Sequence, residues 1–274
     1  MTILVTGASG FVGSRIMALF KDAVPAPSLR DADEARIAEI VDAVRPDVIL
    51  HTAAISDIPT CEQHPEASYR ANVLTPAALA RAAQGAKLVM FSSDQVYGGS
   101  PNEGPFAEGD ERPVNVYARH KLEMERRVLD IAPDAVMLRA TWMYDMPLYG
   151  ADNRGNFLIN TLRAAITHTP LSYRRTEYRG ITYVREVAKL TRRAVDLPGG
   201  VYNFGSENSM SMYDTALFLS NALGLDAPKV EPSGRHNLWM DCGKLRSHGI
   251  SFSQTAEGLT RCIDDYGLKA LCGC

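Results

Sequence analysis

The feature that most constrains the fold is a glycine-rich turn directly after a short apolar run at the start of the chain. Ile3-Leu4-Val5 predicts a buried strand, and residues 6–13 fit the pattern T-G-x-x-G-x-x-G ahead of a helix predicted over residues 13–20. Glycines let a backbone approach a pyrophosphate, and a helix N-terminus offers free N–H groups and partial positive charge. The pattern predicts a dinucleotide site, with a tight turn that binds nothing as the alternative.

Beyond this turn, strand and helix patterns alternate up to about residue 145. Residues 48–50, 87–91 and 135–138 predict buried strands, and residues 33–44, 67–83 and 117–131 predict helices. Pro25 and Pro27 interrupt the pattern before the first of these helices. The alternation predicts an α/β fold with a doubly wound parallel sheet, the Rossmann arrangement, whose ligands bind at the carboxyl ends of the strands.

The pattern becomes less regular in the second half of the chain. Helices are predicted over residues 157–167, 211–223 and 255–266, and a strand over 201–204. We expect residues 1–145 to form the NAD(P)-binding domain, joined by returning segments near residues 183–205. Residues 146–274 are expected to form mainly a small C-terminal substrate lobe.

Composition narrows the function classes. The net charge of −3 argues against a nucleic-acid partner, which needs a basic surface. No apolar run reaches the roughly 20 residues of a membrane helix, and the chain begins with strand-like sequence, so we expect a cytoplasmic protein without membrane or targeting segment. The odd cysteine number indicates reduced thiols. Cys272 and Cys274 supply only half a metal site, so we predict no metal and a frayed tail.

A candidate catalytic group lies at the start of the helix predicted over residues 117–131. Tyr117 and Lys121 form Y-x-x-x-K, and residues four apart share a helix face. The ammonium is expected to lower the pKa of the phenol, which can then pass a proton to a carbonyl oxygen. Ser93 ends the preceding strand and can donate to the same oxygen. The alternative is a surface Tyr–Lys pair. We expect His120 to be solvated and His51 to be structural rather than a base.

The choice between NADP and NAD depends on the segment after the first helix. Dinucleotide folds often place an acid there for the ribose, or an Arg for a 2′-phosphate. This segment shows no acidic residue at the end of an obvious second strand, but it contains Arg30. Arg30 can meet a 2′-phosphate, or it can be a solvated residue at a helix start. We therefore expect NADP or NAD, with Arg30 favouring NADP.

These motifs together resemble the extended short-chain dehydrogenase/reductase family. The residues that carry this resemblance are Gly7 to Gly13, Ala53-Ala54, Asn72, Ser92-Ser93, Tyr117 and Lys121. More narrowly, the chain is similar to the dTDP-4-dehydrorhamnose reductases and their relatives. The stretches that carry this narrower similarity are residues 45–49, 92–97, 115–117, 139–144, 155–157, 183–184 and 241–245.

The resemblance implies roles for individual residues. Ser93, Tyr117 and Lys121 would be catalytic, Ser93 and Asp94 would contact the sugar, and Trp142 would pack on it, unless Trp142 is a core residue. Asn72 matches an Asn that helps to order the active-site helix and water. The motifs and the resemblance together place these residues at the dinucleotide: Gly7, Gly10, Phe11, Val12, Gly13, Arg30, Ala53, Ala54, Ile55, Tyr117 and Lys121.

The sequence also departs from the family pattern. Ile55 stands where a polar residue is usual, Gln95 where an aromatic residue is usual, and the loop 146–154 is unfamiliar. Sugar-nucleotide 4,6-dehydratases, which resemble the same segment, carry Asp-Glu where this chain has Asp94-Gln95. Because Gln95 cannot titrate, elimination would lack a proton-transfer group.

The resemblance implies an NAD(P)H-dependent reductase of a 4-keto nucleotide-sugar. It is also compatible with a homodimer. A nucleotide-sugar epimerase and a dinucleotide-binding regulatory subunit without turnover stay open as alternatives. The short basic cluster of Arg174, Arg175 and Arg179 can pair with a substrate diphosphate or be an ordinary charged loop.

Overall fold

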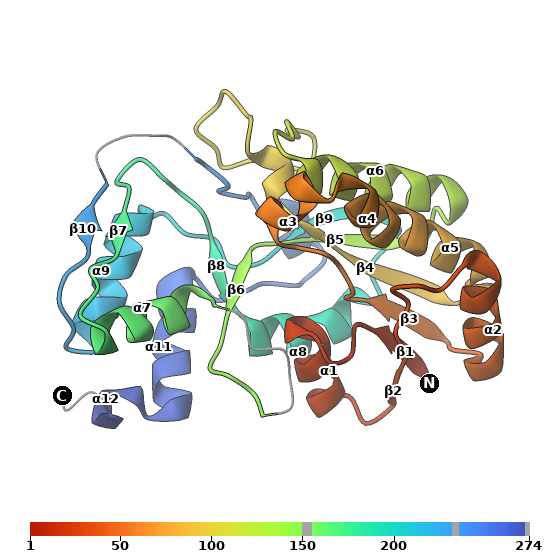
Figure 1. Cartoon of the computed structure of the whole chain (residues 1–274), viewed down its shortest axis with the longest axis horizontal. Coiled ribbons are helices and arrows are strands. Elements are labelled where there is room, and N and C mark those ends of the chain that lie inside the picture. Colours follow the sequence, from red (N-terminus) through yellow and green to blue (C-terminus); the bar gives the residue numbers. More distant parts are fainter. Residues whose placement is uncertain (150–154, 232–235, 272–274) are drawn as a thin grey trace.

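The computed structural model describes residues 1–149, 155–231 and 236–271, so the predicted tail at Cys272 and Cys274 lies outside the described residues. A parallel sheet of six strands, in the order β2-β1-β3-β4-β5-β9, forms the centre of the larger part of the molecule (Figure 1). The predicted doubly wound α/β fold is confirmed. The strands of this sheet are β1 (Ile3–Thr6), β2 (Ala23–Pro25), β3 (Val48–His51), β4 (Lys87–Ser93), β5 (Val136–Ala140) and β9 (Gly200–Phe204).

Alternating side chains on these strands build two cores, one on each face of the sheet. On β1, Ile3 and Val5 join one cluster, and Leu4 between them joins the other. On β4, Val89 and Met90 divide in the same way. Successive side chains of a strand point to opposite faces, so a continuous apolar run is what a strand needs when helices cover both sides.

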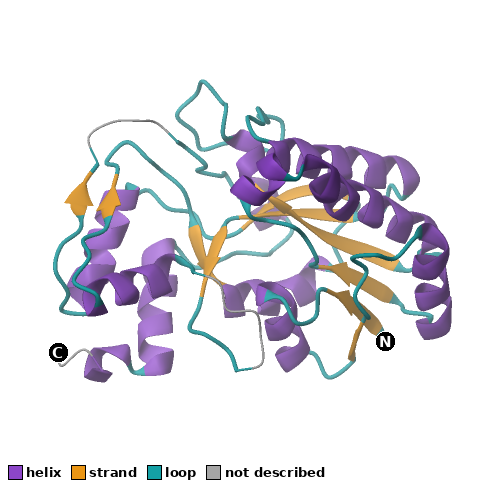
Figure 2. Ribbon diagram, in the orientation of Figure 1, coloured by secondary structure: helices purple, strands orange, loops and turns teal. Residues whose placement is uncertain are grey.

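Helices cover both faces of the sheet, as the purple ribbons in Figure 2 show. One face is covered by α1 (Phe11–Leu19) and α8 (Val184–Ala194), which pack on each other. The other face is covered by α2 (Glu34–Val44), α5 (Thr75–Ala82) and α6 (Val116–Ile131). Before α5, the chain forms α3 (Ile58–Gln63), α4 (Pro65–Tyr69) and a π-helical turn over Arg70–Leu74. A 3₁₀ turn over Asp94–Tyr97 follows β4.

The second half of the chain builds a smaller lobe with its own core. The short strands β6 (Trp142–Tyr144) and β8 (Ile181–Tyr183) pair between this lobe and the sheet (Figure 1). Its core includes Phe157, Met212 and Leu259. The other elements after β6 are α7 (Phe157–Ile166), β7 (Ser172–Tyr173), α9 (Met212–Ala222), β10 (Lys229–Val230), α10 (Gly243–Ser247), α11 (Thr255–Tyr266) and α12 (Leu268–Leu271).

Several local predictions differ from the structure. Pro25 does not break the pattern but ends the edge strand β2, because an edge position does not need its missing N–H. The helix predicted over 67–83 is split by the π-helical turn at Arg70–Leu74. β9 pairs with β5 in the central sheet. The domain boundary at residue 145 stays a prediction.

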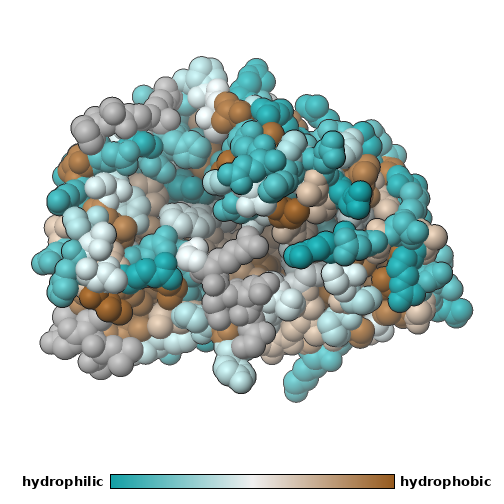
Figure 3. Space-filling model, in the orientation of Figure 1, coloured by the Kyte–Doolittle hydropathy of each residue, from teal (hydrophilic) through white to brown (hydrophobic). Residues whose placement is uncertain are grey.

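The surface is mixed in character. In Figure 3, hydrophilic side chains cover most of the visible face, and hydrophobic ones form small separate groups. Within the described ranges, none of the helices is both long and apolar enough to cross a membrane.

Candidate active site at the carboxyl edge of the sheet

The glycine turn between β1 and α1 is as tight as the sequence predicts. Gly7 has φ of +66°, a conformation that favours glycine, and a Cβ there would lie 2.7 Å from the backbone nitrogen of Ala53. A Cβ on Gly13 would lie 2.1 Å from the carbonyl oxygen of Gly7. Neither position tolerates a side chain, because backbone atoms cannot move aside. The turn therefore lies against the segment Ala53–Ile55 that follows β3.

This turn fits a dinucleotide. A Cβ on Gly10 would meet the Gly7 carbonyl at 3.1 Å and no other atom of the described chain within 4 Å, so this side of the loop is open. Gly10 is also the N-cap of α1 and has no side chain to bond the N–H groups of the first turn, which includes Phe11, Val12 and Gly13. Arg30 is exposed in the loop after β2. Open backbone donors at a helix N-terminus are what a pyrophosphate requires.

Tyr117, Lys121 and Ser93 come together between α6 and the end of β4. The side chain of Asn115 caps α6 by accepting from the Ala118 N–H at 2.8 Å, which fixes Tyr117 in the first turn. The Ser93 hydroxyl lies close enough to the Tyr117 phenol to lower its pKa. Lys121 Nζ donates to the Phe91 carbonyl oxygen at 2.7 Å and lies 5.9 Å from the centre of the Tyr117 ring. The structure thus brings together all three side chains predicted as catalytic.

The expectation that Lys121 lowers the pKa of the phenol is wrong for this structure. Burial raises the pKa of Tyr117 well above its usual range, and the nearby Ser93 hydroxyl opposes that rise only in part. The Lys121 ammonium is directed at the Phe91 carbonyl instead. Burial also lowers the pKa of Lys121, to about 8. The phenol is therefore neutral, which is the form that can donate a proton.

Asn72 organises the loop that follows β3. Its amide nitrogen donates to the Ile55 carbonyl at 2.9 Å, and its amide oxygen accepts from the Ile55 N–H at 3.2 Å. Asn72 lies in the π-helical turn, a type of distortion frequent at functional sites. Its amide also donates to Ser68, whose hydroxyl bonds the imidazole of His120 at 2.9 Å. His120 is half-buried rather than fully solvated, because it contacts Ser68 and Tyr69 of α4.

His51 is structural, as expected. Its Nδ1 bonds the Thr6 hydroxyl at 2.7 Å, joining the ends of β1 and β3. Burial, with the Lys121 charge adding, lowers the pKa of His51 to about 3, so the imidazole is neutral. Its Nε2 is buried without a hydrogen-bond partner within the described part of the chain.

The side of the site that faces the smaller lobe carries a buried ion pair. Arg179 donates from Nη2 to Asp94 Oδ2 at 2.7 Å, and its guanidinium lies 5.5 Å from the centre of a Trp142 ring. Trp142 is half-buried and packs edge-on against Phe157, so one part of it is core and another part is accessible. Gln95, which is buried, accepts from Asn115 at 3.4 Å.

The basic cluster does not act as one unit. Arg174 pairs with Glu231 at 2.6 Å, and Arg175 pairs with Asp214 at 3.3 Å, as in an ordinary charged loop. Of the three arginines, Arg179 is the one that pairs with Asp94, the residue next to Ser93. The sequence offered no local signal for this difference, because Arg179 and Asp94 lie 85 positions apart.

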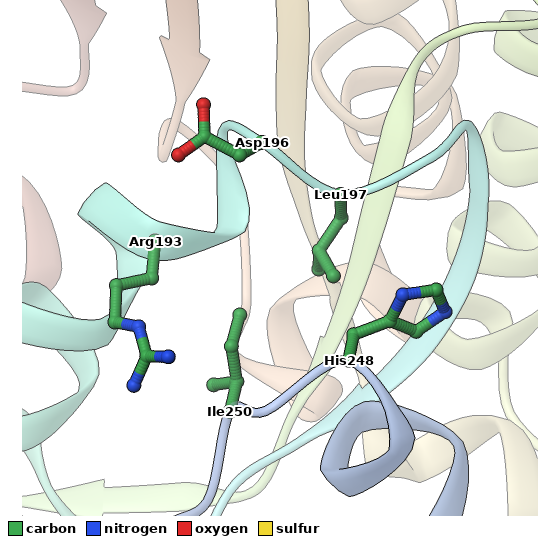
Figure 4. Close-up of a pocket in the computed structure, with 5 residues that line it drawn as sticks. All are labelled: Arg193, Asp196, Leu197, His248 and Ile250. Atoms are coloured by element: carbon green, nitrogen blue, oxygen red, sulfur yellow. The ribbon is translucent and has the colours of Figure 1, made fainter.

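A separate pocket of about 190 Å³ lies at the opposite edge of the sheet, where β9 begins (Figure 4). Ligand sites are usually larger, at about 300–1,000 Å³. The guanidinium of Arg193 is used to donate to the Gly249 carbonyl at 2.8 Å. The pocket is remote from the carboxyl ends of the strands, and we assign it no role. Its lining residues are Arg193, Asp196, Leu197, His248 and Ile250. Among the described residues, His, Cys, Asp and Glu side chains form no group that could hold a metal ion.

Comparisons with known proteins agree with the fold. The family model described as the RmlD substrate binding domain matches residues 1–244. A dTDP-4-dehydrorhamnose reductase from Mycolicibacterium smegmatis is 30% identical, covering 85% of this chain and 72% of the relative. The methionine adenosyltransferase 2 subunit beta of Danio rerio is 25% identical, covering 92% of this chain and 86% of the relative.

Solved structures give the same fold. A dTDP-4-dehydrorhamnose reductase from Clostridium acetobutylicum superimposes with a TM-score of 0.84 at 25% identity, covering 97% of this chain and 100% of that one. A dTDP-4-dehydrorhamnose reductase from Bacillus anthracis in complex with NADP also has a TM-score of 0.84, at 22% identity, covering 97% of this chain and 99% of that one.

Proposed function

Because the chain belongs to the RmlD substrate binding domain family, a family of sugar-nucleotide reductases, we propose that it is an NAD(P)H-dependent reductase of a 4-keto nucleotide-sugar. The family contains NAD(P)-dependent oxidoreductases, and the open glycine turn at Gly10 suits such a cofactor. The substrate class and the residue roles are our proposal. One observation carries it: Ser93, Tyr117 and Lys121 gather at the carboxyl edge of the sheet, with Lys121 Nζ 5.9 Å from the centre of the Tyr117 ring.

The proposed reaction divides the work among three side chains. Tyr117 gives its phenolic proton to the keto oxygen, and Ser93 donates a hydrogen bond to that same oxygen, drawing negative charge onto it. Lys121 contributes a positive charge beside the phenol and reaches the cofactor ribose. The nicotinamide, when bound, supplies the hydride. Gln95 has no proton to transfer, which favours reduction over elimination.

Turnover is expected to decline as the pH rises above about 8, because burial lowers the pKa of Lys121 to that value and the ammonium then loses its proton. The measurement is kcat with saturating NADPH across neutral and alkaline pH. In Lys121→Arg the charge persists over this range, so the alkaline decline should vanish even if kcat is lower. An identical decline in both proteins would exclude Lys121 as its source.

Arg30→Ala is expected to raise KM for NADPH roughly 10- to 100-fold and leave KM for NADH unchanged, since a hydrogen bond to a charged group contributes about 1.5–3 kcal/mol. Steady-state kinetics with each cofactor measures this. Arg36→Ala is the matched control, because Arg36 is an exposed arginine of α2 that pairs with Glu39 at 2.8 Å. Equal changes for both cofactors would show that Arg30 does not contact a 2′-phosphate.

A second candidate function is a regulatory subunit that binds a dinucleotide without turning it over. The similarity to methionine adenosyltransferase 2 subunit beta over 92% of this chain favours it. Retention of Ser93, Tyr117 and Lys121 in one buried cluster speaks for catalysis, because a binding subunit needs no proton donor. An epimerase would use the same three residues and recycle its cofactor.

The proposal is tested by following the absorbance of NADPH, and separately of NADH, as a panel of 4-keto nucleotide-sugars is added. Stoichiometric oxidation with one sugar is the expected result. Interconversion of sugars without net oxidation would identify an epimerase. Tight binding of the dinucleotide with no oxidation across the panel would contradict the reductase and favour the regulatory subunit.

A further inference from the structure

A buried ion pair connects the catalytic hydroxyl groups to the smaller lobe. The Arg179 and Asp94 side chains are 11% and 3% exposed, and 2.7 Å separates Nη2 of the arginine from Oδ2 of the aspartate. Asp94 directly follows Ser93 at the end of β4, whereas Arg179 lies just before β8. The pair therefore spans the two parts of the molecule at the point where the substrate would bind.

Hydrogen bonds extend this pair toward the proposed acid. The second carboxylate oxygen of Asp94, Oδ1, accepts from the Ser93 hydroxyl at 3.3 Å. The Ser93 hydroxyl also lies close to the phenol of Tyr117 and lowers its pKa. Hydrogen bonds thus lead from the guanidinium through Asp94 to Ser93, which lies beside the phenol. Because an ionised carboxylate only accepts, Asp94 holds the Ser93 hydrogen toward itself until the keto oxygen arrives and takes over that hydrogen. The Ser93 oxygen accepts from the Gln95 N–H at 3.2 Å, which leaves one lone pair for the Tyr117 phenol.

The backbone around Arg179 is fixed. Its carbonyl oxygen accepts from the Asn208 amide at 3.0 Å, and its backbone bridges to Leu238. A Cβ on the next residue, Gly180, would lie 1.8 Å from the Ser206 carbonyl, so the chain passes too close there for any other residue. Arg179 Nε is buried without a hydrogen-bond partner among the described residues. A guanidinium kept in place at the cost of an unpaired donor indicates a role beyond packing.

We propose that Arg179 is a positioning residue: by holding Asp94 as an ionised carboxylate, it sets the direction in which the Ser93 hydroxyl donates and so prepares Tyr117 to deliver its proton. This inference rests on the proposed reductase function. It assigns to one member of the basic cluster a role in orienting the reaction, rather than in binding a diphosphate.

The charges around the pair agree with this role. Burial raises the pKa of Asp94, and Arg179 acts against that rise. The Tyr117 phenol also faces Asp94, whose charge raises the pKa of the phenol. His236, Glu177 and Arg174 surround the arginine, and burial together with both arginines lowers the pKa of His236, so that side chain is neutral. Without Arg179, Asp94 would take up a proton at higher pH and become a donor, which would reverse its hydrogen bond with Ser93.

Arg179→Gln is expected to lower kcat about 10- to 100-fold, the usual loss when a reacting group is misplaced. The acid limb of the kcat profile should move to higher pH by about 1 to 3 pH units, the effect of one adjacent guanidinium on an aspartate. Arg179→Lys keeps the charge, so it should restore much of kcat and bring the acid limb back toward its wild-type pH. Arg175→Gln is the matched control, because Arg175 belongs to the same loop and pairs with an exposed carboxylate. Unchanged pH profiles in Arg179→Gln would overturn the inference.

A second measurement does not depend on turnover. The side-chain carboxyl ¹³C signal of Asp94, assigned with Asp94→Asn, is titrated in the wild-type protein and in Arg179→Gln. An upward move of the Asp94 pKa in the variant supports the inference, and identical titrations refute it. If the wild-type protein reduces no sugar, the proposed function fails, while this titration still decides whether Arg179 controls Asp94.

Discussion

Tyr117→Phe is expected to lower kcat by about 10²- to 10⁴-fold, the usual contribution of a positioned acid, and to leave dinucleotide binding intact. The hydroxyl is the only group removed, from a tyrosine that is 7% exposed and whose high pKa keeps it protonated and ready to donate. The glycine turn at Gly7 and Gly13 is on another element and does not contact it. The measurements are kcat with the sugar that the panel identifies and the Kd for NADPH.

The control for this variant is Tyr202→Phe. Tyr202 is also a buried tyrosine, but its hydroxyl donates to the Pro198 carbonyl at 3.0 Å, at the opposite edge of the sheet. Losing that hydrogen bond should reduce the free energy of unfolding by about 0.5–1.5 kcal/mol and leave kcat unchanged. If Tyr117→Phe retained wild-type kcat, Tyr117 would not be the acid.

The parts of the site that could be predicted from sequence are those set by neighbours in the chain. The glycine turn depends on close approaches among Gly7, Gly10 and Gly13, and the spacing of these glycines in the sequence is enough to predict the turn. Tyr117 and Lys121 share a face because they lie four apart on a helix. Ser93 was placed correctly at the edge of the sheet because it ends an apolar strand.

The parts that could not be predicted depend on residues far apart in the sequence. Asp94 looks the same in the sequence whether it is solvated or paired with Arg179, and the choice is made by where β8 and its preceding loop pack. The pKa of Tyr117 was mispredicted for a similar reason. Helical spacing brings Lys121 near the phenol, but spacing does not reveal that the Phe91 carbonyl accepts from the ammonium or how much burial costs the phenolate.

Arg139 carries the other large expected effect, this time on stability. It is 1% exposed on β5 and donates to both carboxylate oxygens of Glu125, at 2.9 Å from Nε and 2.6 Å from Nη2. Its Nη1 donates to the Tyr97 hydroxyl at 2.7 Å. Glu125 also accepts from the Ser92 hydroxyl at 2.5 Å. This network of hydrogen bonds around Arg139 and Glu125 therefore fixes α6 to the ends of β4 and β5.

This network is connected to the catalytic residues through the helix. Glu125 lies four residues after Lys121, which lies four after Tyr117, so one face of α6 carries all three side chains. Ser92, which donates to Glu125, directly precedes Ser93. Loosening the network should displace the phenol from the serine as well as destabilise the fold.

Arg139→Met is expected to lower the free energy of unfolding by about 3–5 kcal/mol, because it leaves the Glu125 carboxylate buried without its cation. Denaturant unfolding measures the loss. Arg81→Met is the matched control: Arg81 makes the same two-bond contact with Glu34 on the surface, where an ion pair contributes about 0.2–1 kcal/mol.

The double variant Arg139→Met with Glu125→Leu decides the cause of that loss. If the cost is the stranded carboxylate, removing it should recover much of the lost stability, because a buried ion pair is often replaceable by apolar side chains. If the double variant were no more stable than Arg139→Met, the loss would come from the remaining contacts of the guanidinium with Tyr97 and Glu111. Recovered stability with kcat still low would then show that the ion pair is needed to set the position of α6 rather than to hold the domain together.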